Sequence, residues 1–144
     1  MNTRSRTLIA ILAGFALVAS TAAASGSFTL QVFQGFHFPS SEVVKSGAST
    51  ADLNFTYQTR RAGMISYLGA DKIRFFPTAP KPGSISAAEV AQWKDYVAGP
   101  EPGYYVLRAH SNGKLYLVQL ISFENQGRAA SSWRMQFNWQ EFGS

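Results

Sequence analysis

The sequence contains no cysteine. A chain without cysteine forms no disulfide framework, no zinc–thiolate or iron–sulfur site, and has no thiol nucleophile. It also has no cysteine to which a lipid could be attached behind an export signal. The folded protein must therefore be held together by its core alone.

Charged residues are scarce as well, at 15% of the 144 residues, and the formal net charge is +5. Without the first 24 residues, 11 Lys and Arg remain against 8 Asp and Glu, a net charge of +3. This weak excess contains no basic cluster beyond the pair Arg60–Arg61, so it does not predict nucleic-acid binding. Apolar residues make up 46% of the chain, which is typical of a globular domain and not of a disordered segment.

The N-terminus has the three parts of a secretory signal peptide in their usual order. A short basic region comes first, an apolar run of 12 residues spans 8–19, and the small residues Ala22 and Ala24 occupy the −3 and −1 positions of a cleavage site. The run is short for a membrane span, which needs about 20 residues. We therefore expect a signal peptide over 1–24 and a single domain over 25–144. That domain is expected in the bacterial periplasm or outside the cell, without a membrane anchor.

The mature chain should begin at Ser25, because small side chains precede it at both positions that signal peptidase reads. The intact mass of the exported protein tests this prediction. A mass that still includes residues 1–24 would contradict it.

Alternation of apolar and polar residues predicts a mainly β domain. In the last expected strand every odd residue is large and apolar and every even residue is polar. In the second, Leu53, Phe55 and Tyr57 are expected to face the core while the polar residues between them face solvent. The segment 35–41 is expected to interrupt the sheet. The expected strands cover residues 28–33, 52–59, 63–68, 73–76, 104–110, 114–123 and 133–140.

One helix is predicted over residues 87–98. Ser86 and Glu89 have the spacing of a capping box, and apolar residues follow at helical spacing as far as Val97. The dipeptide Asn112-Gly113 predicts a type I′ hairpin, which requires positive φ at both central positions. The expected fold is an antiparallel sheet or a sandwich-like single domain with one short helix.

Part of the chain resembles a known family over roughly residues 50–142. The segments that carry the resemblance are Tyr105-Val-Leu-Arg, Asn112-Gly113-Lys114, Tyr116-Leu-Val-Gln-Leu-Ile-Ser-Phe123, the alternating aromatic strand after them, and Asp52-Leu53-Asn54-Phe55. Together they resemble the HmuY-like family of secreted bacterial haem-binding proteins, which have a mostly β fold. The chain departs from the family at Ala51, where the family has Trp, and lacks its lipid-attachment cysteine. The family's haem-ligating residues match no positions here, so the resemblance implies haem binding without naming a ligand.

A haem iron takes axial ligands from His or Met. Apart from the initiator, the chain offers His37, His110, Met64 and Met135. His37 lies between two phenylalanines, a setting that suits a porphyrin, but a half-buried loop residue is its commoner role. His110 stands beside a turn, where a solvated imidazole is the commoner role, and Met135 belongs to the apolar face of the last strand. His37 is the better of the two histidine candidates.

Arginines and aromatic residues are the candidates for ligand contact. Arg60 and Arg61 can bind haem propionates or another carboxylate in bidentate fashion, although arginine pairs more often face solvent. Tyr104 and Tyr105, with other aromatic residues, can line an apolar cleft. The same aromatic residues can instead enlarge a core that lacks disulfides, and this is the interpretation we favour.

Catalytic motifs are absent from the sequence. There is no Gly-x-Ser-x-Gly elbow, no Gly-rich phosphate loop and no His-Glu-x-x-His, and the carboxylates form no pair. We therefore expect a binding protein and not an enzyme. The first hypothesis is an exported carrier of haem or another small apolar ligand. The alternative is an exported β domain without a cofactor that binds a protein or a glycan.

Overall fold

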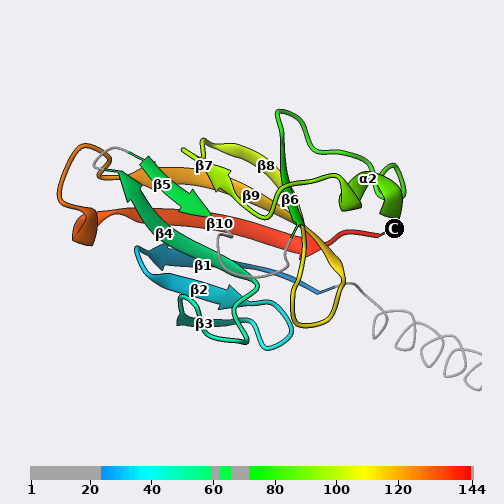
Figure 1. Cartoon of the computed structure of the whole chain (residues 1–144), viewed down its shortest axis with the longest axis horizontal. Helices are drawn as coiled ribbons and strands as arrows, with labels where there is room; N and C mark the ends of the chain where they lie inside the picture. The colour runs from blue at the N-terminus through cyan, green and yellow to red at the C-terminus, as the bar shows by residue number, and fades with distance from the viewer. Residues whose placement is uncertain (1–23, 60–61, 66–71, 144) are drawn as a thin grey trace, which may run out of the picture.

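The computed structural model describes residues 24–59, 62–65 and 72–143. These residues form two antiparallel sheets of five strands each (Figure 1). The first has the order β1 (Ser25–Gln31), β10 (Arg134–Glu141), β9 (Leu115–Glu124), β8 (Gly103–Arg108) and β6 (Lys72–Phe76). The second has the order β3 (Glu42–Lys45), β2 (Gln34–His37), β4 (Leu53–Thr59), β5 (Ala62–Ile65) and β7 (Val97–Ala98). The helix α2 (Ala87–Ala91) and the 3-10 turn η1 (Ala130–Ser132) lie outside the sheets. The expected mainly β, sandwich-like fold is confirmed.

Aromatic rings from both sheets fill the space between them. Phe28 of β1 stacks on Phe36 of β2 with ring centroids 3.8 Å apart, and on Phe137 of β10 at 4.9 Å. Phe38, just after β2, stacks on Tyr116 of β9 at 4.3 Å. These rings are all buried. The aromatic excess of the sequence therefore enlarges the core, as favoured above.

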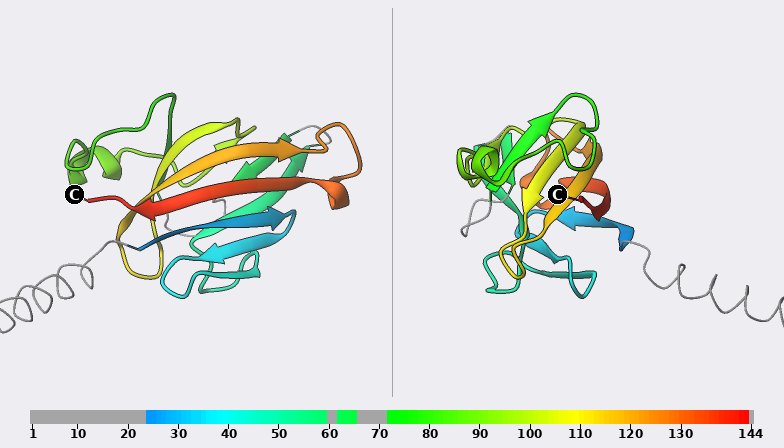
Figure 2. Two further views of the ribbon diagram at one scale, coloured as in Figure 1. Left: turned by 180° about the vertical axis from the view of Figure 1, so that it is seen from behind. Right: turned by 90° about the vertical axis from the view of Figure 1, so that its right-hand side faces the viewer.

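The alternation of the last strand is confirmed. Met135, Phe137 and Trp139 are buried, whereas Arg134 and Asn138 are exposed. The strand pairs with β1 on one side and β9 on the other, so it lies inside the first sheet. Figure 2 shows these three long strands side by side, with α2 and the C-terminus together at one end of the molecule.

The expectation that β4 has one solvated face is wrong. Asn54 and Thr56 are buried, and Tyr57 is 39% exposed although it was expected in the core. The chain segment before β4 folds back over its polar face, where Asn54 Oδ1 accepts a hydrogen bond from the Gly47 N–H at 3.0 Å. A loop rather than solvent therefore contacts Asn54 Oδ1, while the buried Asn54 Nδ2 has no hydrogen-bond partner among the described residues. Alternation of apolar and polar residues does not reveal such a cover.

The expected interruption at 35–41 is also wrong in part, because Gln34–His37 form strand β2. Gly35 pairs with Val44 on one side and with Asn54 on the other. A Cβ at this position would stand 3.0 Å from Ala51 Cβ and from the Leu53 carbonyl oxygen. Glycine is needed at this position because atoms of Ala51 and Leu53 lie too close for a side chain, and not because the strand ends there.

The predicted helix is shorter than expected. Ser86 caps it as predicted, its Oγ accepting from the Glu89 N–H at 3.1 Å. However, the helix ends at Ala91, and Val97 belongs to strand β7. The chain leaves the helix because Lys94 forms a β-bridge with Ile73 of the first sheet.

The hairpin between β8 and β9 forms as predicted, but its turn is not of type I′. Gly113 has φ 71°, while Asn112 is not among the described residues with positive φ. The Gly113 N–H donates to the Ala109 carbonyl at 2.9 Å, which makes the turn longer. The Asn112 side chain accepts from the Lys114 N–H at 3.0 Å and donates to the Tyr116 hydroxyl at 3.0 Å. This side chain therefore fixes the longer turn.

Replacing Phe137 by Ala should destabilise the protein by about 3–5 kcal/mol, because a buried aromatic ring is lost from the centre of the core. Asn138→Ala, on the exposed face of the same strand, should cost under about 0.5 kcal/mol. Urea denaturation measures both. Equal midpoints for the two variants would show that the facing of β10 is wrong.

Candidate functional site

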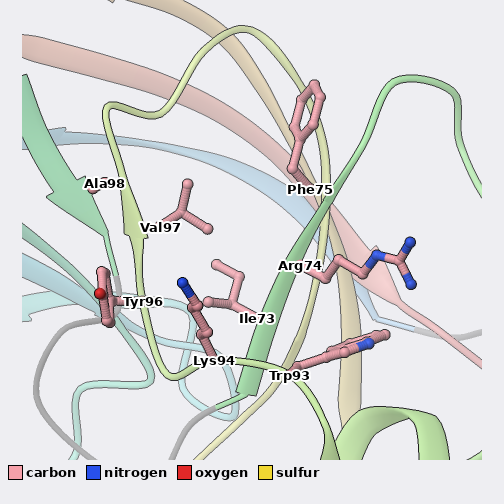
Figure 3. A pocket seen from close by; sticks show the side chains of 8 residues that line it. All are labelled: Ile73, Arg74, Phe75, Trp93, Lys94, Tyr96, Val97 and Ala98. Carbon is pink, nitrogen blue, oxygen red and sulfur yellow. The ribbon is translucent and has the colours of Figure 1, made fainter.

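A pocket of about 490 Å³ lies where the edge strands of the two sheets meet. A β-bridge joins β6 to the segment before β7, with the Ile73 N–H donating to the Lys94 carbonyl at 2.8 Å. The pocket extends along β6 and β7 beyond this bridge (Figure 3). It is lined by Ile73, Arg74, Phe75, Trp93, Lys94, Tyr96, Val97 and Ala98.

The apolar side of the pocket is held in place by the first sheet. Ile73 is buried, and the Phe75 ring lies 5.2 Å from that of Tyr105 on the neighbouring strand β8. Gly103, with φ 148°, leaves the space that this ring occupies, since a Cβ there would overlap with it. Backbone and ring packing thus fix the apolar wall without any ligand.

Lys94 supplies the positive charge of the pocket. Figure 3 shows its ammonium group on the same side of β6 as Ile73 and Val97, whereas Arg74 extends to the other side. There Arg74 forms an ion pair with Glu89, with Nη1 and Oε1 3.4 Å apart. Lys94 Nζ stands 5.9 Å from the centre of the Tyr96 ring, a weak cation–π distance. Lys94 is exposed, so its ammonium group lies at the solvent side of the apolar wall.

The backbone of β6 adds a hydrogen-bond donor. Alternate residues of a strand direct their N–H groups to the same edge. Because the Ile73 N–H points to Lys94, the Phe75 N–H points to the same side. The pocket thus combines an apolar wall, an ammonium group and a backbone N–H.

The two histidines lie at a different place, beside the buried Asp52. The Asp52 carboxylate accepts hydrogen bonds from the Phe38 N–H at 3.0 Å, the Ser111 N–H at 2.8 Å and the Ser111 hydroxyl at 3.0 Å. Phe38 follows His37 in the sequence, and Ser111 follows His110. Asp52 therefore brings the segments that carry both histidines to one end of the molecule, and neither histidine lines the pocket.

His37 is half-buried at the end of β2, and His110 is exposed in the hairpin turn. The Nδ1 atom of His37 lies 2.6 Å from Ser40 Oγ, which in turn donates to Glu42 Oε2 at 3.3 Å. In a catalytic triad the carboxylate contacts the second ring nitrogen of the histidine, and here it contacts the serine. This exposed cluster does not have the order of a triad.

The other candidate residues are scattered. Tyr105 is 1% exposed, and its hydroxyl donates to the Glu101 carbonyl at 2.7 Å, so it forms part of the core. Tyr104 is half-buried beside a separate hollow of about 110 Å³. The backbone of Met64 in β5 pairs with Ala98 in β7. Met135 is buried in the core, and Arg60 and Arg61 lie outside the described residues.

Sequence reasoning missed the residues that line the pocket. The stretch from Trp93 to Val97 satisfies helical spacing, so Lys94 and Tyr96 were placed on a helix. The signal against a helix was the pair Tyr96-Val97, since aromatic and β-branched residues favour strands. Two residues are too few for that preference to be recognised.

Within the described ranges, no helix is long and apolar enough to cross a membrane. In the same part of the chain, no three His, Cys, Asp or Glu side chains come together as they would around a metal ion. Comparison of the chain with protein-family models, with curated proteins and with solved structures finds no match.

The Tyr105 hydroxyl should make stability depend on alkaline pH. Burial raises the pKa of Tyr105 to about 12 from its usual 10, while the backbone bond to Glu101 lowers the pKa and the Glu101 charge raises it. Because the folded-state pKa is the higher one, the protonated hydroxyl favours folding below pH 10. This contribution is lost as the pH rises from 10 to 12.

Urea unfolding at about pH 9 and about pH 11.5 measures this loss in the wild type and in Tyr105→Phe. The variant should lose less stability between the two values, because it has no hydroxyl to ionise. An equal loss in both proteins would contradict the role given to this hydroxyl.

Proposed function

We propose that the protein is an exported, non-enzymatic binding protein that carries a small, largely apolar ligand with one acid group in the pocket between β6 and β7. The observation that supports this function is the ammonium group of Lys94 beside the apolar wall of Ile73 and Phe75. Ligand pockets are mostly apolar and use few polar groups to orient the ligand. The export signal expected in the sequence supports a location outside the cytoplasm.

An acid group is the natural partner of this arrangement. A carboxylate beside the wall would accept hydrogen bonds from Lys94, and charged hydrogen bonds are stronger than neutral ones. The ligand's hydrocarbon part would cover the half-buried Phe75 and Val97, and each CH₂ group that it buries contributes about 0.8 kcal/mol. Aliphatic and aromatic carboxylic acids both meet these requirements.

Haem, which the resemblance implies, does not fit the residues that line this pocket. None of them is histidine or methionine, and the phenol of Tyr96 is the one side chain among them of a type known to bind haem iron. His37 and His110 lie beside Asp52 instead. The proposed ligand is therefore an apolar acid, and haem is a compound against which the proposal is tested.

Titration with a dansyl-labelled fatty acid, followed by its fluorescence, tests the proposal. Lys94→Gln should weaken binding of the acid roughly five- to ten-fold, because a charged hydrogen bond becomes a neutral one. It should leave binding of the corresponding alcohol unchanged. Lys45→Gln is the matched control, since β3 and β7 are opposite edges of the same sheet.

Three results would contradict the proposal. The first is no binding of the acid to the wild type, and the second is equal binding of the acid by wild type and Lys94→Gln. The third concerns haemin, titrated in parallel and followed by its Soret band. A Soret shift that disappears in His37→Ala or His110→Ala would place the ligand site beside Asp52.

A further inference from the structure

Phe33 has a backbone conformation that aromatic residues rarely adopt. It lies in the turn between β1 and β2 with φ 68°, in the left-handed region where a Cβ is crowded. Two backbone bonds hold it there: its N–H donates to the Phe55 carbonyl at 2.7 Å, and its carbonyl accepts from the Ser46 N–H at 2.9 Å. Glycine or asparagine would adopt this conformation at lower cost.

The ring of Phe33 is not explained by the core, because the residue is 62% exposed. A largely exposed aromatic ring in an unfavourable backbone conformation contributes little to packing and nothing to backbone geometry. Unfavourable conformations of this kind concentrate at ligand sites, where the surrounding structure maintains them. The position of this ring therefore points to a ligand.

Phe33 borders a hollow of about 430 Å³ that is separate from the β6–β7 pocket. The hollow is lined by Phe33, Tyr57, Gly127, Arg128, Ala129 and Ala130. Figure 1 shows that the β1–β2 turn and the loop before β10 lie at the end of the molecule away from α2. The hollow therefore lies between the β1–β2 turn and the loop before β10.

Hydrogen bonds within the protein form the hollow in advance. The ring of Tyr57 lies 5.6 Å from that of the buried Trp133, whose Nε1–H donates to the Arg128 carbonyl at 3.0 Å. The Arg128 N–H donates to the Asn125 carbonyl at 3.1 Å, and the Asn125 side chain donates to the Ser132 carbonyl at 2.8 Å. A preformed site loses little entropy when a ligand binds.

We propose that this hollow is a second binding site and that it takes an acidic sugar unit of a glycan. Phe33 and Tyr57 are too exposed to envelop a ligand, as a purely apolar molecule would need. They can cover one face of a flat ring, and the negative face of an aromatic ring attracts the C–H groups of a sugar. Arg128 is the charged residue of the lining, and a guanidinium group binds a carboxylate in bidentate fashion.

Calorimetric titration of the mature protein with tetragalacturonate, and with its neutral methyl ester, tests this site. Phe33→Asn should weaken binding of both ligands at least ten-fold, because the ring on which both ligands stack is lost. Its urea midpoint should be equal to or higher than that of the wild type, because asparagine tolerates positive φ. Arg128→Gln should weaken binding of the acidic ligand about ten-fold and leave binding of the ester unchanged.

Arg134→Gln, an exposed arginine on β10, is the control and should bind as the wild type does. The proposal is overturned if the wild type binds neither ligand at millimolar concentration, or if Phe33→Asn binds as tightly as the wild type. A clearly lower urea midpoint for Phe33→Asn would also overturn it, since the ring would then serve the fold. Lys94→Gln should not change binding of the glycan, which separates this site from the β6–β7 pocket.

Discussion

The packing of aromatic rings between the two sheets is the constraint on which the rest of the structure depends. Phe28 of the first sheet stacks on Phe36 of the second with ring centroids 3.8 Å apart, and Phe38 stacks on Tyr116 at 4.3 Å. In a chain without cysteine, this packing joins the sheets. The same rings occupy the interior, so a ligand site must lie at an edge or an end of the sandwich. Both proposed sites do.

Hydrogen bonds to Asp52 are a second constraint on the structure. Its buried carboxylate joins the segment after β2 to the β8–β9 hairpin through Phe38 and Ser111. These bonds fix the end of the sandwich where both histidines lie. They also separate the histidines from the edge where β6 and β7 form the pocket. The apolar wall and the two histidines therefore belong to different parts of the molecule, which favours an apolar acid over haem at the pocket.

Local patterns predicted the elements that depend on local causes. Alternation predicted β10 because one face of the strand is buried along its length and the other is not, and the capping box predicted where α2 begins. The elements that were missed depend on contacts distant in sequence. Lys94 leaves helical geometry because it bridges to Ile73, and Gly35 lies in a strand because β3 and β4 pair with it. Strand β7 likewise exists because it pairs with Met64 and Ile65 of β5, so the pocket that it borders could not be predicted either.

The most direct test of the β6–β7 pocket is the ¹⁵N–¹H amide spectrum of the mature protein during a titration with decanoate. The proposed function predicts saturable shifts at the amides of Phe75, Lys94 and Val97, which line the pocket. The amides of Phe38 and Ser111, beside Asp52, should not move. Shifts confined to Phe38 and Ser111, or no saturable shift at any residue, would contradict the proposed function.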